Sequence, residues 1–512
     1  MASAHTEISH EPPAPTGVVE SFRYAFSSPT RLRKEVLAGL TVGLALIPEA
    51  IAFSILAGVD PALGLFASVI MAITIALTGG RPAMISAATG AVALVIAPVA
   101  REHGVDYFIA TVLLAGVLQI VLAVLGVAKL QRFIPRSVMT GFVNALGILI
   151  FTAQLEHLID VPKVVYVLVA AGIAIMIGWP KLTGAIPAPL ITIVVISAVV
   201  GFAGFRVPTV SDMGQLPDSL PRLFVPDVPM TLETLRIIAP YALGMAIVGL
   251  LESLMTAKLV DDITDTHSDK TRESWGQGVA NIASGIFGGM GGCAMIGQTM
   301  INVRESGART RLSTLLAGVF LLAFILLLGD VVGQIPMAAL VAIMIMVSVG
   351  TIDWHSVHPR TLKFMPLSET VVMLVTVVAT LATSNLAVGV VLGVITAMIT
   401  FARRVAHLAS VEQVSAEDTT DDGQVDTRTY RIHGQLFWAS SNDLVYAFDY
   451  TDPAENIVLD LSAAEVWDAS TVATLDSVTR KFEERGKTVT IVGLDGPSKD
   501  RLDRLSGKLN SQ

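Results

Sequence analysis

Residues Leu46–Leu65 read LIPEAIAFSILAGVDPALGL, an apolar stretch in which Glu49 stands among alanine, isoleucine and phenylalanine. A second stretch, Gly276–Ser313, reads GQGVANIASGIFGGMGGCAMIGQTMINVRESGARTRLS and is rich in glycine and other small residues. A helix crosses about 30 Å of hydrocarbon with about 20 mostly apolar residues. The first stretch is therefore suited to a membrane span, and it carries a carboxyl group where an ionised one is costly.

The composition extends this interpretation to most of the chain. Of the 512 residues, 53% are hydrophobic and 15% are charged, and the mean hydropathy is +0.67. Ordinary soluble domains carry about 25% charged residues. Charge-free apolar runs recur without polar alternation, which predicts helical spans rather than transmembrane strands. The runs include Pro61–Gly80, Pro82–Ala100, Phe108–Ala128, Val138–Leu155, Leu182–Phe205, Leu312–Gly329 and Val331–Ile352.

The run Thr370–Phe401 is too long for one crossing, and its Thr383-Ser384-Asn385 sequence predicts a turn between two spans. The total is about 14 spans by this length criterion. Lysine and arginine gather in alternate loops, starting with Arg31, Arg33 and Lys34 before the first span. This positive-inside pattern predicts that both termini are cytoplasmic.

The composition changes after Arg404. Residues 407–427 are expected to be an acidic linker, since Ser415–Thr427 reads SAEDTTDDGQVDT. Beyond it, three short runs predict strands and one predicts a helix with Ser470 as its N-cap: Tyr430–Trp438, Asn456–Leu461, Thr488–Leu494 and Ser470–Arg485. We therefore expect a cytoplasmic segment over 1–30, a transmembrane domain over 31–406 and a small α/β domain over 428–512.

Two parts of the membrane region resemble each other. LAGLTVGLALIPEAIAFSILAGVDP contains Glu49, APYALGMAIVGLLESLMTAKLVDD contains Glu252, and each is followed by a small-residue stretch, Ile85–Gly90 or Gly288–Thr299. Inverted repeats with a broken helix in each half are the build of many secondary transporters. Helix N-termini carry free N–H groups and partial positive charge, so two of them that face each other predict an anion site. No lysine or arginine lies deep inside a span.

At Leu46–Leu65 and Gly276–Ser313 the sequence resembles the sulfate permease (SulP) family, whose animal relatives include prestin and pendrin, and the match runs from about Arg31 to Leu505. The segment Leu459–Ser470 (LDLSAAEVWDAS) resembles the STAS domain that ends most members. The resemblance implies an α-helical polytopic membrane protein of about 14 segments in a 7+7 inverted repeat with core and gate domains. It also implies a homodimer in the bacterial cytoplasmic (inner) membrane that transports sulfate, bicarbonate, chloride or dicarboxylates.

The resemblance assigns the anion site by position to Ser86, Ala87 and Ala88 in one half and to Gly297, Gln298 and Thr299 in the other. Sodium-coupled bicarbonate members use an aspartate and a threonine where this chain has Glu252 and Thr256. Ile296 stands where a further threonine ligand would be expected, which favours proton coupling or no coupling.

Glu49 and Glu252 are the sharpest candidates for coupling, because a carboxyl in hydrocarbon usually has a partner or a proton role. The hypothesis is that one of them binds a proton that accompanies the anion, by symport or exchange with an elevator-type mechanism. The alternative is that each lies closer to the membrane interface and is structural.

Three other functions stay open: a sodium-coupled bicarbonate transporter, an anion channel or uniporter, and a nucleobase–proton symporter of the same fold. An enzyme is not expected, and neither a metal nor another cofactor is, because no nucleophile–base pair or metal-ligand cluster stands out. The chain has no basic patch interleaved with aromatic residues, so nucleic acid is not expected as a partner. Membrane lipid, the transported anion and the coupling ion are the expected partners.

Overall fold

The computed structural model describes residues 15–127, 129, 134–182, 188–214, 219–406, 409–417, 426–441 and 444–508. The chain divides into two compact units, Met1–Val394 and Ile395–Gln512. The first unit carries the apolar helices, and the second carries a four-stranded sheet.

The first unit repeats one order of elements. After the short α1 (Val18–Phe26), the first half comprises α2 (Pro29–Ala57), α3 (Pro61–Thr78), β1 (Ser86–Ala88) with α4 (Gly90–His103), α5 (Val105–Val124), α6 (Arg136–Glu156), α7 (Lys163–Leu182) and α8 (Ala188–Ala203). The second half comprises α9 (Leu232–Thr264), α10 (Lys270–Ile286), β2 (Gly292–Ala294) with α11 (Ile296–Met300) and the π-helix η3 (Ile301–Glu305), α12 (Arg311–Gly333), α13 (Met337–Thr351), α15 (Leu367–Thr383) and α16 (Leu386–Ala406). The last of these helices, α16, continues past Val394 into the second unit. The short helices η2 (Val210–Asp212) and α14 (Pro359–Phe364) lie outside this repeat. Among the described residues, each half thus has seven membrane segments, which confirms the predicted repeat.

Eight of the described helices are long and apolar enough to cross a membrane, and α8, α13 and α15 are shorter apolar helices. The predicted turn between α15 and α16 is confirmed. Ser384 ends α15 in the left-handed region with a φ of 51°, and the Asn385 side chain accepts a hydrogen bond from the Ala387 N–H at 2.9 Å. The long apolar run is therefore two spans, because the backbone reverses at this capped turn.

The two predicted broken helices are confirmed, and they cross each other. β1 and β2 pair antiparallel, with Ala87 opposite Cys293, and a helix begins just after each strand. A side chain at position 292 would collide with the Ala87 carbonyl oxygen, so glycine is required there. The crossing brings two stretches that are far apart in sequence into direct contact inside the unit.

The helix α10 holds this crossing in place through a polar stripe that the sequence analysis did not identify. The side chains of Gln277 and Asn281, one turn apart, are both buried. Gln277 donates to the Ser86 hydroxyl at 2.6 Å. Asn281 donates to the Gly292 carbonyl at 3.0 Å and accepts from its N–H at 2.9 Å. Because these partners replace water, the irregular backbone of the crossing can lie inside a membrane protein.

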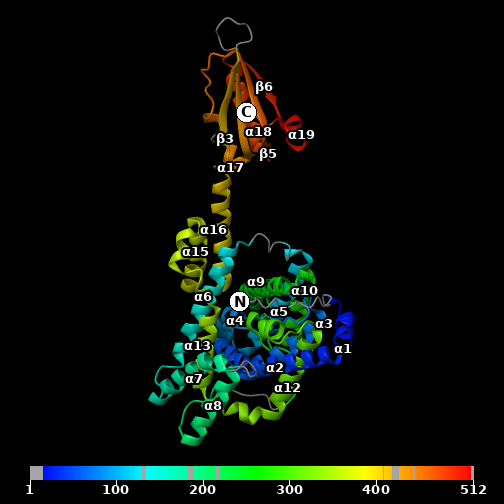
Figure 1. The fold of residues 1–512 in the computed structure, drawn as a ribbon, viewed down its shortest axis with the longest axis vertical. Helices are drawn as coiled ribbons and strands as arrows, with labels where there is room; N and C mark the ends of the chain where they lie inside the picture. The colour runs from blue at the N-terminus through cyan, green and yellow to red at the C-terminus, as the bar shows by residue number, and fades with distance from the viewer. Residues whose placement is uncertain are drawn as a thin grey trace, which may run out of the picture. The chain divides into compact units, whose positions relative to one another are not determined.

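The helices of the first unit form two groups (Figure 1). A core bundle contains α2 to α5 and α9 to α12, with β1 and β2 at its centre. A gate bundle contains α6, α7, α8, α13 and α15, which pack on one another. Contacts of α2 with α8 and α13, and of α4 with α6, join the two bundles.

The second unit contains a sheet in the order β3-β4-β5-β6, formed by β3 (Ser410–Glu417), β4 (Thr427–Leu436), β5 (Asn456–Val466) and β6 (Thr488–Val492). The strands β4, β5 and β6 run parallel, and β3 runs antiparallel to β4. The helix α18 (Ala469–Glu483) contributes the buried Val472, Leu475 and Phe482 to the core against β4 and β5. The remaining helices are α17 (Trp438–Ser441), η4 (Leu444–Tyr446) and α19 (Gly496–Leu505).

The three predicted strands and the predicted helix of this unit are confirmed. The strand β3 was not predicted, and all of it lies within residues 407–427, the range expected to be an acidic linker. The prediction that Ser470 caps the helix is wrong. The N-cap is Asp468, whose carboxylate accepts from the Thr471 N–H at 2.9 Å, and Ser470 lies inside the first turn.

Candidate functional site

A cavity of about 380 Å³ lies between the core bundle and the gate bundle. The core bundle contributes α2, the start of α4, α9 and the residues just after β2, and the gate bundle contributes α6 and α13. The lining residues are Glu49, Phe53, Thr89, Gly90, Ala91, Phe142, Val143, Leu146, Ile150, Glu252, Met295, Ile296, Gly297, Val347, Gly350 and Thr351. A water molecule occupies about 30 Å³ in the liquid, so the space suits a small hydrated solute.

Glu49 enters the cavity from α2, where it follows Pro48 inside the helix. Its Oε1 accepts a hydrogen bond of 2.9 Å from Nε2 of Gln298 on α11. The Gln298 side chain is buried, and its Oε1 has no hydrogen-bond partner among the described residues. The first half of the repeat thus supplies the carboxyl, and the second half supplies the amide that holds it.

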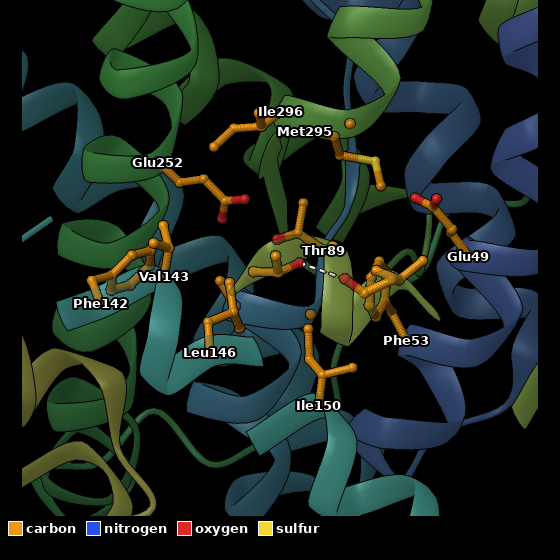
Figure 2. A pocket seen from close by; sticks show the side chains of 16 residues that line it. Glu49, Phe53, Thr89, Phe142, Val143, Leu146, Ile150, Glu252, Met295 and Ile296 are labelled. Atoms are coloured by element: carbon orange, nitrogen blue, oxygen red, sulfur yellow. Dashed lines mark hydrogen bonds between the residues drawn. The ribbon is translucent and has the colours of Figure 1, made fainter. Parts of the chain in front are cut away.

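Glu252 enters from α9 on the opposite side, and Thr89 lies between the two carboxyls in Figure 2. Glu252 is 8% exposed and accepts a hydrogen bond of 3.0 Å from the Cys293 thiol. The same sulfur lies 3.1 Å from the Thr89 hydroxyl oxygen. Both carboxyls are therefore held from the crossing segments, one by an amide and the other by a thiol.

The helix α4 begins at the cavity. Its N-cap is Thr89, whose backbone is extended and whose hydroxyl does not cap the helix. Gly90 and Ala91 follow on the cavity wall. The first N–H groups of a helix lack partners inside it and attract anions. The start of α4 is therefore the part of the wall best suited to a negatively charged group.

Among the described residues that line the cavity there is no lysine, arginine or histidine. Among the described residues of this unit, two arginines are buried, but neither lines the cavity. Arg81 pairs with Asp261 at 3.0 Å, and Arg311 donates to the Ala76 carbonyl at 3.3 Å. The polar side chains of the wall are two carboxyls and two threonine hydroxyls.

The structure brings only some of the predicted site residues to the cavity. Glu49, Glu252 and Gly297 line it, and Gln298 reaches it through its bond to Glu49. The three residues Ser86, Ala87 and Ala88 are buried in β1 and do not line it. The Ser86 hydroxyl accepts from Gln277. Of the segment that contains β1 and the start of α4, the first residue that lines the cavity is Thr89.

Thr299 and Thr256 also point elsewhere. The Thr299 hydroxyl accepts from the Ile85 N–H at 3.0 Å and holds the start of the first crossing. The Thr256 hydroxyl donates to the Glu252 backbone carbonyl at 2.8 Å, within its own helix. Both side chains are fully buried, and neither lines the cavity.

Sequence reasoning missed Thr89, Gly90, Cys293 and the whole contribution of the gate bundle. A local signal existed for the first two, because Thr-Gly ends the small-residue stretch and threonine is a common residue before a helix. The partnership of Cys293 with Glu252 had no such signal. It depends on the crossing, and so do the apolar side chains of α6, which form one wall in Figure 2.

The sulfate permease family model matches residues 32–176 and 163–376, and the STAS domain model matches residues 418–507. YbaR of Bacillus subtilis, whose name assigns it provisionally to sulfate transport, is 48% identical over 475 residues, which are 93% of this chain and 97% of that protein. The bicarbonate transporter BicA of Picosynechococcus is 27% identical over 93% of this chain and 91% of its own length.

Two solved structures resemble the fold. The transmembrane domain of a cyanobacterial BicA matches with a TM-score of 0.62 and 25% identity, over 72% of this chain and 98% of that chain. The murine Slc26a9 anion transporter, solved in the inward-facing state, matches with a TM-score of 0.81 and 15% identity, over 96% of this chain and 90% of that chain. By sequence and by fold, the chain belongs to the sulfate permease family of membrane transporters and ends in a STAS domain.

Proposed function

We propose that this protein is a secondary active transporter that moves a small oxyanion together with protons. Sulfate, bicarbonate and small dicarboxylates are the substrate classes. The anion would bind at the N-terminal end of α4, beside Gly297 and the start of α11. A proton on Glu49 or Glu252 would accompany it. The observation that carries the proposal is a cavity at a helix N-terminus with two carboxyls and no basic side chain on its described wall.

The charges of the wall explain why anion and proton would bind together. Two like charges 4 Å apart repel by about 1 kcal/mol in water and by about 4 kcal/mol at the effective dielectric constant near a protein surface. An anion that enters between ionised Glu49 and Glu252 meets this repulsion twice. A proton on either carboxyl removes one of the two repulsions, and the helix N-terminus then supplies the attraction.

The position of the cavity supports alternating access as the mechanism. Its walls come from both bundles, and the gate bundle contributes mainly apolar side chains such as Phe142 and Ile150. An apolar contact can slide without breaking hydrogen bonds. The core bundle, which carries both carboxyls and the crossing segments, would move as one body along the gate bundle in an elevator-type transition. Both termini would lie in the cytoplasm, and the family's dimeric assembly would place two such sites in the membrane.

Sodium coupling has less support than proton coupling, because the residues predicted to bind sodium make other contacts or are apolar. The Thr256 hydroxyl is used within α9, and the apolar Ile296 lines the cavity where a ligand would be needed. Thr256→Val is therefore a matched control. It should leave transport within about twofold, whereas a sodium site built on Thr256 would lose most of its activity, as metal ligands usually do.

The test is uptake by the purified full-length protein in proteoliposomes. Radiolabelled sulfate, bicarbonate, succinate and uracil are offered with an inward proton gradient, an inward sodium gradient or neither. The proposal predicts accumulation of one oxyanion against its gradient only when the proton gradient is present. Uptake that depends on sodium, that is driven only by the membrane potential, or that is specific for uracil would overturn it in favour of the corresponding alternative.

A further inference from the structure

Three polar side chains form a continuous hydrogen-bonded chain from the coupling carboxyl to the start of α4. The Cys293 thiol donates to Glu252 Oε2 at 3.0 Å, and its sulfur lies 3.1 Å from Thr89 Oγ1. Cys293 is fully buried, Thr89 is 2% exposed and Glu252 is 8% exposed. The two ends of this chain, Glu252 and Thr89, line the cavity, and the sulfur connects them behind its wall.

Each of these three side chains carries at most one proton to donate, and this limits the possible directions of the two hydrogen bonds. A thiol and a hydroxyl each carry one proton, and each can also accept a hydrogen bond. When Glu252 is ionised it only accepts, so the thiol donates to it and the Thr89 hydroxyl donates to the sulfur. When Glu252 is protonated, its O–H can donate to the sulfur, and the thiol proton can turn to Thr89 Oγ1. The Thr89 hydroxyl proton is then free to point into the cavity.

We propose that Cys293 is a positioning residue that makes the Thr89 hydroxyl a donor to the transported anion only when Glu252 carries a proton. Proton binding would reverse the direction of both hydrogen bonds without moving the backbone. The anion would gain one charge-assisted hydrogen bond at the N-terminus of α4 in the protonated state alone. This inference rests on the proposed proton-coupled function and specifies the residues that link its two ligands.

The surroundings of Glu252 leave Cys293 as its direct polar contact. Glu49 faces it from α2 across the cavity. Charged groups of the elements packed against α9 are bonded to other partners. Arg101 of α4 donates to the Leu56 carbonyl, and Asp106 of α5 accepts from the Asp227 N–H. On α10, Lys270 pairs with Asp261, Arg272 donates to the Thr78 carbonyl, and Glu273 accepts from the Gly80 N–H. Asp261, on α9 itself, pairs with Arg81 and Lys270.

The matched pair Cys293→Ser and Cys293→Ala tests the relay, because serine keeps one proton and an acceptor while alanine keeps neither. The KM for the transported oxyanion is measured in proteoliposomes of the wild type and of each variant. The pH is equal on both sides of the membrane and is varied from pH 8 to pH 6. We expect the KM of the wild type and of Cys293→Ser to fall about tenfold over this range. The KM of Cys293→Ala should fall only about threefold, because a proton on Glu252 still removes the repulsion between carboxylate and anion but no longer frees the Thr89 hydroxyl.

A purely structural cysteine would give a different result. Cys293→Ala would then change the maximal rate or the melting temperature but would keep the full fall of about tenfold in KM, and this outcome would overturn the relay. If Cys293→Ala does not fold, Thr89→Val and Thr89→Ser make the same comparison at the other end of the chain. A wild type whose KM does not depend on pH would refute the proton-coupled function itself, which separates the two failures.

A spectroscopic measurement tests the relay without transport. Because Cys293 is the chain's one cysteine, the infrared S–H stretching band of the full-length protein reports a single thiol. We expect the band to shift between pH 8 and pH 6 in the wild type, as the thiol changes its acceptor from a carboxylate to a hydroxyl. The shift should be absent in Glu252→Gln. A band that does not respond to pH, or that responds equally in Glu252→Gln, would contradict the proposal.

Discussion

Among the described residues of the membrane unit, four glutamates are buried or line the cavity, and their surroundings differ between two regions. In the region where α2 meets the start of α12 and α3 meets the start of α10, Glu35 and Glu273 are 4% and 0% exposed. Glu35 accepts the backbone N–H groups of Arg309 at 2.8 Å, Thr310 at 3.1 Å and Ser313 at 3.3 Å. Glu273 accepts the N–H groups of Gly80 at 2.8 Å and Arg81 at 3.0 Å and the Gln277 amide at 2.8 Å.

In the cavity, each carboxyl accepts one hydrogen bond from the described residues: Glu49 from an amide and Glu252 from a thiol. A carboxylate that accepts several N–H groups is fixed in place and satisfies backbone donors that would otherwise be unpaired. A carboxyl with one weak donor keeps lone pairs free for a proton or a ligand. The number of donors therefore distinguishes the two glutamates that hold the fold from the two that we propose to change their protonation during transport.

The sharpest way to break this comparison is to neutralise the cavity carboxyls. Glu252→Gln should lower proton-driven anion accumulation about a hundredfold, because the isosteric amide accepts the thiol proton but cannot titrate. Glu49→Gln should have a smaller effect, about tenfold, since Glu49 is bonded to Gln298, whereas Cys293 connects Glu252 to Thr89 at the start of α4. The measurement is proteoliposome uptake with and without a pH gradient. Unchanged proton-driven accumulation in both variants would remove the proton role.

The second prediction concerns the glutamates that hold the fold and the stability of the protein. Glu273→Ala leaves the Gly80 and Arg81 N–H groups without their acceptor, and an unsatisfied buried group costs about 1–3 kcal/mol. We expect a loss of about 3 kcal/mol in stability, measured by thermal unfolding in detergent. Glu273→Gln, which keeps one acceptor oxygen, is the control and should lose less. The comparison fails if Glu252→Gln lowers the melting temperature as much as Glu273→Ala does.

Two glycines, Gly90 and Gly297, allow the two half-helices to be compared at the proposed anion site. A methyl group at Gly90 would lie 2.7 Å from a Phe53 ring carbon and 3.2 Å from Ile150 Cδ1, whereas a methyl group at Gly297 meets no atom within 4 Å. Gly90→Ala should raise the KM for the anion about tenfold, which is about 1.4 kcal/mol. Gly297→Ala should change it less than twofold. Equal effects would show that the two half-helices contribute alike.

The smallest expected effect concerns stability in the second unit, where a carboxylate near the surface accepts two hydrogen bonds. Asp460 of β5 accepts from the Ser462 N–H and from Arg431 Nε, both at 2.9 Å. Hydrogen bonding by the side chain of Ser462, then by the Arg431 side chain and the Ser462 backbone, lowers the pKa of Asp460 from 3.8 to about 2. A lowered pKa in the folded state stabilises the fold above the unfolded pKa, and this contribution is lost as the pH falls from about 4 to about 2.

Asp460→Asn should therefore destabilise the STAS domain by about 1 kcal/mol at pH 7, a value reduced for solvent screening because the Arg431 side chain is 39% exposed. The difference should vanish near pH 2. The measurement is urea unfolding of the wild type and the variant across this pH range. A difference that stays constant with pH would show that packing, rather than the ion pair, is responsible.

Several features were predictable because they depend on local sequence. Apolar runs report spans, the Thr383–Asn385 break reports a turn, and the glycine-rich stretches report broken helices. The helix α10 is not among the charge-free apolar runs, because its buried face carries Glu273, Gln277, Asn281 and Ser284. Hydropathy cannot distinguish a polar face in water from a polar face whose hydrogen bonds are made within the protein. The N-cap in the soluble unit was misplaced by two residues because aspartate and serine cap equally well.

The sequence by itself determined that the chain fills a membrane in two related halves, each with a broken helix and a carboxyl in an apolar helix. These properties can be read from composition and periodicity along the chain. Placing a charge or an unpaired backbone group in lipid is costly, so the membrane restricts strongly which local sequences can lie in it. Only the tertiary structure decided that Thr89 rather than Ser86 faces the cavity, and that Cys293 rather than a lysine or arginine holds Glu252. Those contacts arise where β1 and β2 cross, and a contact between residues so far apart in sequence depends on packing that no local pattern records.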